Sequence, residues 1–120
     1  MNREDLVKKE QLSDSELQEL LGARERGEVD FTLIDVREPF EYEMSHIVPT
    51  DMLLPTTLFQ QWFPEIQNLK ERNIIIYCRT GNRSYQVQQF LKKDGFNTVG
   101  NLEYGIVDYS GKVAQGSFDG

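Results

Sequence analysis

The sequence has little of three features that would place it in other classes of protein. Its 120 residues include one cysteine and one histidine, and no apolar run approaches the roughly 20 residues of a membrane span. A single cysteine closes no internal disulfide, and a single histidine gives no cluster at metal-ligand spacing. We therefore expect no disulfide framework, no metal, no organic cofactor and no membrane segment.

An excess of positive charge is also missing. The chain carries 13 Lys and Arg against 20 Asp and Glu, a net charge of −7, so nucleic acid is not an expected partner. Residues 1–11 are charged and contain no apolar signal segment, and we expect a cytoplasmic protein. The length and 38% hydrophobic content suit one domain over residues 1–120, with flexible tails at 1–8 and 110–120.

The one cysteine stands between a predicted strand and a predicted helix. The apolar segment 73–77 precedes it, and the run Cys78, Arg79, Thr80, Gly81, Asn82, Arg83, Ser84 follows from it. Apolar residues at helical spacing then predict a helix over 83–94, and Gly95 is typical of its end. The cysteine therefore lies at a helix N-terminus, where backbone donors and the helix dipole stabilise a thiolate.

The residues of this turn favour a reactive cysteine over a merely buried one. Gly81 and Asn82 tolerate left-handed backbone that lets successive N–H groups converge on an anion. We expect Arg79 to reach toward an incoming anion and Arg83 to face inward or to bind a buried carboxylate. The Thr80 hydroxyl is open to two interpretations, a donor to the substrate or a bond to its own backbone.

The rest of the chain predicts an α/β fold. Ser13 and Glu16 form a capping box before a helix, residues 31–36 are typical of a buried parallel strand, and Pro39 begins a short helix through Met44. The carboxyl ends of parallel strands share one sheet edge, which places the ends of 31–36 and 73–77 together.

Charged residues at the end of the first of these strands and just after it are predicted to brace the cysteine turn. These supporting residues are Asp35, Arg37 and Glu41. Buried carboxylates and guanidinium groups usually pair with each other. The i, i+4 spacing predicts that Arg37 pairs with Glu41 across the start of the short helix.

Four segments together resemble the rhodanese-like sulfurtransferases: 33–42, 45–47, 78–84 and 101–106. The resemblance implies a small three-layer α/β domain with a parallel sheet and helices on both faces, and a thiosulfate sulfurtransferase activity. It implies that Cys78 carries a persulfide, that residues 79–83 surround the outer sulfur, and that Ser84 begins the following helix. The implied partners are a small anionic sulfur donor and a cyanide or thiol acceptor, protein thiols included.

Two of these segments depart from the family pattern. The chain reads Ser-His-Ile-Val-Pro-Thr at 45–50 where the family typically has Gly-His-Ile-Pro-Gly-Ala. It has Tyr104 and Tyr109 where the family typically has glycine and tryptophan. We expect these changes to reshape the wall of the pocket.

Three other functions compete with small-molecule sulfur transfer. A persulfide relay to a partner protein would use the same cysteine, and a reshaped pocket rim favours it. A cysteine-dependent phosphatase is disfavoured, because Cys78 and Arg83 are one residue closer in sequence than such enzymes need to wrap a phosphate. A noncatalytic rhodanese-like binding module usually lacks the cysteine that this chain has.

Overall fold

The computed structural model describes residues 1–120, which form one five-stranded sheet, one two-stranded sheet and the helices around them. The elements are α1 (Arg3–Leu6), β1 (Gln11–Leu12), α2 (Asp14–Glu25), β2 (Thr32–Asp35), α3 (Pro39–Met44), β3 (His46–Ile47), β4 (Met52–Leu53), η1 (Thr56–Leu58), α4 (Phe59–Trp62), η2 (Phe63–Leu69), β5 (Asn73–Tyr77), α5 (Asn82–Lys93), β6 (Thr98–Leu102), η3 (Ile106–Asp108) and β7 (Val113–Ala114).

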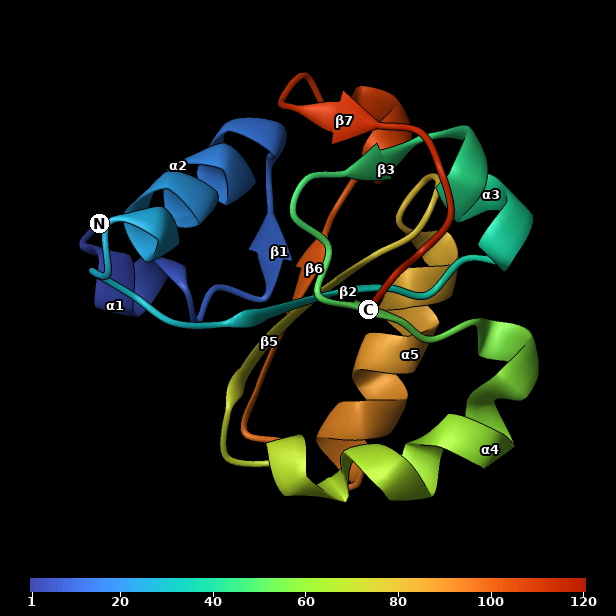
Figure 1. Cartoon of the computed structure of the whole chain (residues 1–120). Coiled ribbons are helices and arrows are strands. Elements are labelled where there is room, and N and C mark those ends of the chain that lie inside the picture. The colour runs from blue at the N-terminus through green and yellow to red at the C-terminus, as the bar shows by residue number, and fades with distance from the viewer.

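The larger sheet is parallel throughout, with strand order β1-β6-β5-β2-β4. Helices α1 and α2 cover one face of it, and α4 and α5 cover the other (Figure 1). This confirms the predicted three-layer α/β fold. Asp35 of β2 lies opposite Tyr77 of β5, so the segments that follow these two strands leave the sheet at one edge.

The central strand β5 is buried on both faces, which explains its continuous run of apolar residues. Ile75 and Tyr77 point into the core beneath α1 and α2. Ile74, Ile76 and Cys78 point into the core beneath α4 and α5. The alternation therefore places the cysteine side chain on the α5 side of the sheet.

Both predicted helix signals are confirmed at their caps. Ser13 and Glu16 form a reciprocal capping box at the start of α2. At the end of α5, Gly95 has a φ of 95°, and the Phe96 N–H donates to the Leu91 carbonyl at 3.1 Å. None of the helices combines the length and the apolar character needed to cross a bilayer.

Both chain ends pack on the domain. In the segment 1–8, which we expected to be a tail, α1 contacts α2 and Leu6 and Val7 are buried. In the segment 110–120, β7 pairs antiparallel with β3, and the Phe118 ring meets the edge of Tyr42. The contacts of β7 and Phe118 join residues distant in sequence, which local patterns do not reveal.

Candidate active site

The Cys78 sulfur lies at the N-terminus of α5, ringed by hydrogen-bond donors. The Gly81 N–H donates to Sγ at 3.1 Å, the Ser84 N–H at 3.4 Å and the Ser84 hydroxyl at 3.2 Å. The cysteine is only 1% exposed. Donors to sulfur and the positive end of the helix dipole both stabilise a negative charge at this position.

Further donors in the same loop are unused. The N–H groups of Thr80, Asn82 and Arg83 donate to no acceptor within the protein. They lie in the same short run as the two N–H groups that bind Sγ: Thr80 precedes Gly81, and Asn82 and Arg83 stand between Gly81 and Ser84. The loop is therefore a backbone nest with capacity for an anion beyond the cysteine sulfur itself.

Two glycines fix the loop against the segment that follows β6. A Cβ on Gly81 would lie 2.0 Å from the Glu103 carbonyl oxygen, and one on Gly105 would lie 2.1 Å from the Arg79 oxygen. Both glycines also have positive φ, 98° and 73°. The Ile106 N–H donates to the Cys78 carbonyl at 3.0 Å. The loop geometry is thus set by main-chain contacts that only glycine permits.

Arg83 faces a carboxylate on α3 and forms a bidentate ion pair with it. Its two terminal nitrogens lie 2.8 Å from the two oxygens of Glu41. This hydrogen bonding lowers the pKa of Glu41 to about 2 and raises the pKa of Arg83. The pair ties the cysteine loop to α3, and the Arg83 guanidinium is occupied on that side.

The predicted pair between Arg37 and Glu41 is wrong. Arg37 instead binds Asp35 through Nε and Nη2, at distances from 2.8 to 3.2 Å, and donates to the Ser45 carbonyl at 2.7 Å. The i, i+4 rule applies within a helix, but α3 begins at Pro39 after its cap Glu38. Arg37 lies in the extended segment before the helix, which directs its side chain back to the end of β2.

The other predicted loop residues lie at the surface. Arg79, Thr80 and Asn82 are exposed, and Arg79 joins none of the ion pairs of the protein. The Thr80 hydroxyl makes no hydrogen bond to its own backbone, so it is free at the surface of the loop.

The single histidine packs against α3 and contacts no residue of the cysteine loop among its hydrogen-bond and stacking partners. His46 stacks on Tyr42 at 3.7 Å between ring centroids, and its Nδ1 lies 2.9 Å from the Tyr42 carbonyl oxygen. No group of three or more His, Cys, Asp or Glu side chains gathers at metal-binding distances.

Comparison with known proteins identifies the family and the fold. The family model of the rhodanese-like domain matches residues 16–112. The chain belongs to the rhodanese-like domain family. That match includes the cysteine loop and the segments before and after it, from β2 to the residues beyond β6.

Rhodanese-like sequences and structures of several organisms are similar to this chain. It is 40% identical over 68% of its length to a rhodanese-like/PpiC domain-containing protein 12, chloroplastic, from Arabidopsis thaliana, and 31% identical over 72% to a tRNA uridine(34) hydroxylase from Enterobacter sp.. It spans 27% and 26% of these relatives, about a quarter of their length. A rhodanese-related protein from Thermoplasma volcanium superposes with a TM-score of 0.71 at 24% identity, covering 88% of this chain and 98% of that one.

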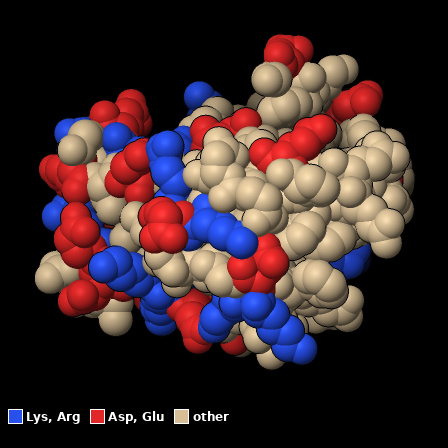
Figure 2. All heavy atoms as spheres, turned by 90° about the horizontal axis from the view of Figure 1, so that it is seen from below, with Lys and Arg blue, Asp and Glu red and all other residues tan.

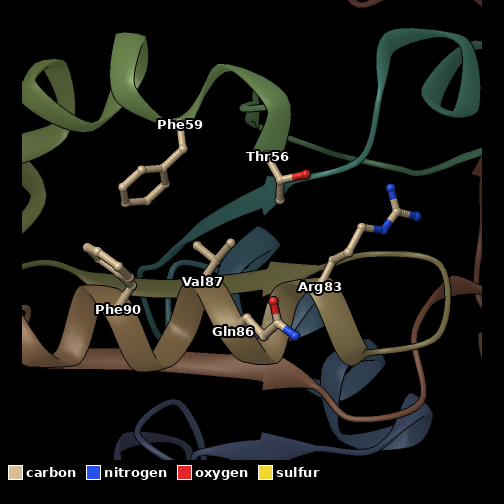
Figure 3. A pocket seen from close by; sticks show the side chains of 6 residues that line it. All are labelled: Thr56, Phe59, Arg83, Gln86, Val87 and Phe90. Carbon is tan, nitrogen blue, oxygen red and sulfur yellow. The ribbon is translucent and has the colours of Figure 1, made fainter.

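Two grooves flank this rhodanese-like loop. One, of about 270 Å³, runs between α4 and α5 (Figure 3) and is lined by Thr56, Phe59, Arg83, Gln86, Val87 and Phe90. Figure 3 shows the Arg83 guanidinium pointing away from the two phenylalanine rings at the opposite end. The other, of about 500 Å³, lies beside α3 and η3 and is lined by Arg37, Phe40, Glu41, Met44, Ser45, Arg79, Ile106 and Val107.

Sequence reasoning missed the contribution of the segment after β6. The sequence did hold a sign of the role of Gly105. Glycine at this position agrees with the family pattern, and the structure gives it a positive φ and a close approach to the cysteine loop. The hydrogen bonds from Ile106 and Val107 to the carbonyls of Cys78 and Arg79 had no such sign, because they join backbone groups distant in sequence.

Proposed function

We propose that this domain is a sulfurtransferase in which Cys78 carries sulfane sulfur as a persulfide. One observation carries the proposal: Gly81 and Ser84 surround the Cys78 sulfur with donors, while neighbouring N–H groups of the same loop remain free. The Gly81 and Ser84 donors stabilise the attacking thiolate. The free N–H groups can stabilise the negative charge of the outer sulfur in the persulfide.

The chemistry is a double displacement. The Cys78 thiolate attacks the sulfane sulfur of thiosulfate, a new S–S bond forms, and sulfite leaves with the electron pair of the broken bond. Cyanide or a thiolate then attacks the outer sulfur, and the Cys78 thiolate leaves. Both steps begin and end with an anion in the loop, which is why backbone donors suffice and no metal is required.

The ion pair of Arg83 disfavours phosphatase chemistry. A phosphatase needs its loop arginine to clamp the equatorial oxygens of the phosphoryl group. Here both terminal nitrogens of Arg83 bind Glu41, at 2.8 Å each. The spacing between cysteine and arginine and the occupied guanidinium therefore favour sulfur over phosphorus.

The direct test is sulfur uptake by the intact protein. We expect incubation with thiosulfate to add one sulfur atom per chain, and cyanide to remove it with release of thiocyanate. Intact-protein mass spectrometry measures the first step and thiocyanate formation the second. A protein that gains no sulfur, or that hydrolyses a phosphate ester faster than it moves sulfur, would contradict the proposal.

The rim of the site favours a protein as one physiological partner. Three apolar side chains that line the groove beside Arg79 are largely exposed: Phe40 at 65%, Met44 at 67% and Val107 at 60%. Tyr104, in the segment after β6, is 58% exposed. Thiosulfate, a small dianion, gains nothing from apolar side chains. Exposed apolar groups gathered at one opening are typical of an interaction surface. An apolar segment of a partner protein would contact Phe40, Met44 and Val107 beside Arg79, the residue that follows Cys78.

Charged side chains on one face of the molecule do not gather into a patch of one sign. Figure 2 shows Lys and Arg interspersed with Asp and Glu over part of one face, and a broad area without charged side chains on the side where Figure 1 places α4. Arg79, which joins none of the ion pairs of the protein, is a cation at the groove beside α3 and η3, where Phe40, Met44, Ile106 and Val107 are the apolar lining residues. We propose that the rim selects a thiol flanked by apolar residues.

Rim variants separate the relay from small-molecule transfer. In a Phe40→Ser, Val107→Ser variant we expect sulfur transfer to a peptide with apolar residues beside its cysteine to fall about tenfold, as for the loss of two apolar contacts. Turnover with thiosulfate and cyanide should stay within about twofold, because neither reagent uses those contacts.

Phe90→Ser is the matched control for this comparison. Phe90 is 58% exposed but lies on α5, in the other groove. Its replacement should leave transfer to the peptide unchanged. In the Phe40→Ser, Val107→Ser variant, an equal fall in peptide transfer and in thiosulfate–cyanide turnover, or no fall with the peptide, would exclude the rim as a docking surface.

A further inference from the structure

A buried asparagine behind the cysteine loop makes an incomplete set of hydrogen bonds. Asn101 of β6 is 1% exposed, and its Nδ2 donates to the Gly81 carbonyl at 3.3 Å and to Gln11 Oε1 at 3.1 Å. Its Oδ1 is buried and has no partner. An unpaired buried oxygen destabilises the fold, and an apolar side chain would avoid that penalty. The presence of an asparagine side chain at position 101 is therefore better explained by a role in function than by a contribution to stability.

The orientation of this amide is fixed by its neighbours. Both atoms that Nδ2 contacts are acceptors, the Gly81 carbonyl and the Gln11 side-chain oxygen. Reversal of the amide would place Oδ1 against the Gly81 oxygen, without a hydrogen between them. The Asn101 NH₂ group is therefore directed at the carbonyl of the residue that caps α5.

The same contact orients a donor on the opposite side of the peptide group. The Gly81–Asn82 peptide is trans, so its C=O and N–H point in opposite directions. When Asn101 holds the carbonyl behind the loop, the Asn82 N–H points away from β6. Gly81 precedes Asn82 directly and Ser84 follows it by two residues, and the N–H groups of both donate to Sγ.

We propose that Asn101 is a positioning residue for sulfur transfer, which holds the Gly81–Asn82 peptide so that the Asn82 N–H receives the anionic outer sulfur. The Asn82 N–H has no acceptor in the protein, as this role requires. The Tyr85 N–H also donates to the Gly81 carbonyl, at 3.0 Å, so the helix start survives without Asn101. The inference rests on the sulfurtransferase function proposed above.

The test replaces Asn101 with leucine, which has a similar volume and no donor. We expect Asn101→Leu to lower the second-order rate of sulfur loading from thiosulfate about tenfold, as for a lost supporting hydrogen bond at a charged site. Alkylation of Cys78 by iodoacetamide, a neutral reagent, should stay within about twofold, because the donors to Sγ itself are unchanged. The melting temperature should be equal or higher, since the unpaired oxygen is gone.

Two further variants complete the design. Gln11→Ala removes the other partner of the Asn101 amide without touching Gly81, and it should load sulfur at the wild-type rate. Asn101→Ala provides the same test if leucine does not fit. Wild-type rates of loading in both Asn101 variants, or a parallel fall in loading and alkylation, would overturn the inference. A wild-type protein that does not load sulfur would instead refute the proposed function.

Discussion

Replacement of Cys78 with serine is expected to abolish sulfur loading and to leave the fold intact. A serine hydroxyl stays protonated near neutral pH and has no sulfur to form the persulfide bond. The smaller oxygen still finds the Gly81 N–H and the Ser84 hydroxyl as partners, so the substitution leaves no polar group unsatisfied. We therefore expect the loss to concern chemistry alone.

Intact-protein mass spectrometry after thiosulfate treatment measures this result, with urea unfolding as the check on stability. Ser84→Ala is the informative companion, because it removes a donor to Sγ and keeps the nucleophile. We expect it to load sulfur about tenfold more slowly. Sulfur uptake by Cys78→Ser at any rate near wild type would place the adduct elsewhere and contradict the role of Cys78.

The sequence predicted the parts of the site that local patterns determine. The helix after the cysteine begins at Asn82, one residue from its expected start, because apolar periodicity and a glycine stop both act over a few residues. The helix Pro39–Met44 has its expected bounds for the same reason, a proline at its first position. The shared sheet edge followed from the expectation of parallel strands, whose carboxyl ends lie at one edge, and β2 and β5 are indeed parallel neighbours.

Side-chain partners were predicted less well, since they depend on where a helix begins and on distant contacts. Arg37 and Glu41 have helical spacing, but only Glu41 is in the helix. Arg37 pairs with Asp35, and Glu41 pairs with Arg83. Asn101 stands in a buried strand with no motif of its own, and its contact to Gly81 crosses from β6 to the loop after β5. Such contacts require the tertiary structure.

The second large effect concerns the buried ion pair at the end of β2. The side chains of Asp35 and Arg37 are 0% and 5% exposed, and their charged atoms lie 2.8 Å apart. Asp35→Ala leaves a buried guanidinium without its carboxylate. We expect a loss of about 3–5 kcal/mol in the free energy of unfolding, typical of breaking one side of a buried pair. Urea denaturation measures it.

A double substitution tests whether the buried charge itself is responsible. Asp35→Leu with Arg37→Met removes both charges and keeps apolar volume, so we expect it to be less destabilised than Asp35→Ala. Equal stability of the two variants would mean that packing, rather than an unpaired charge, dominates.

The same pair also matters for the cysteine loop, through a chain of contacts. Arg37 holds the Ser45 carbonyl at the end of α3, and α3 carries Glu41, which holds Arg83. Without Asp35 to orient Arg37, α3 loses its anchor to the sheet. The folded fraction of Asp35→Ala should therefore load sulfur more slowly than wild type, measured well below its unfolding midpoint. Wild-type loading by that fraction would show that the Arg83–Glu41 pair positions the loop without help from β2.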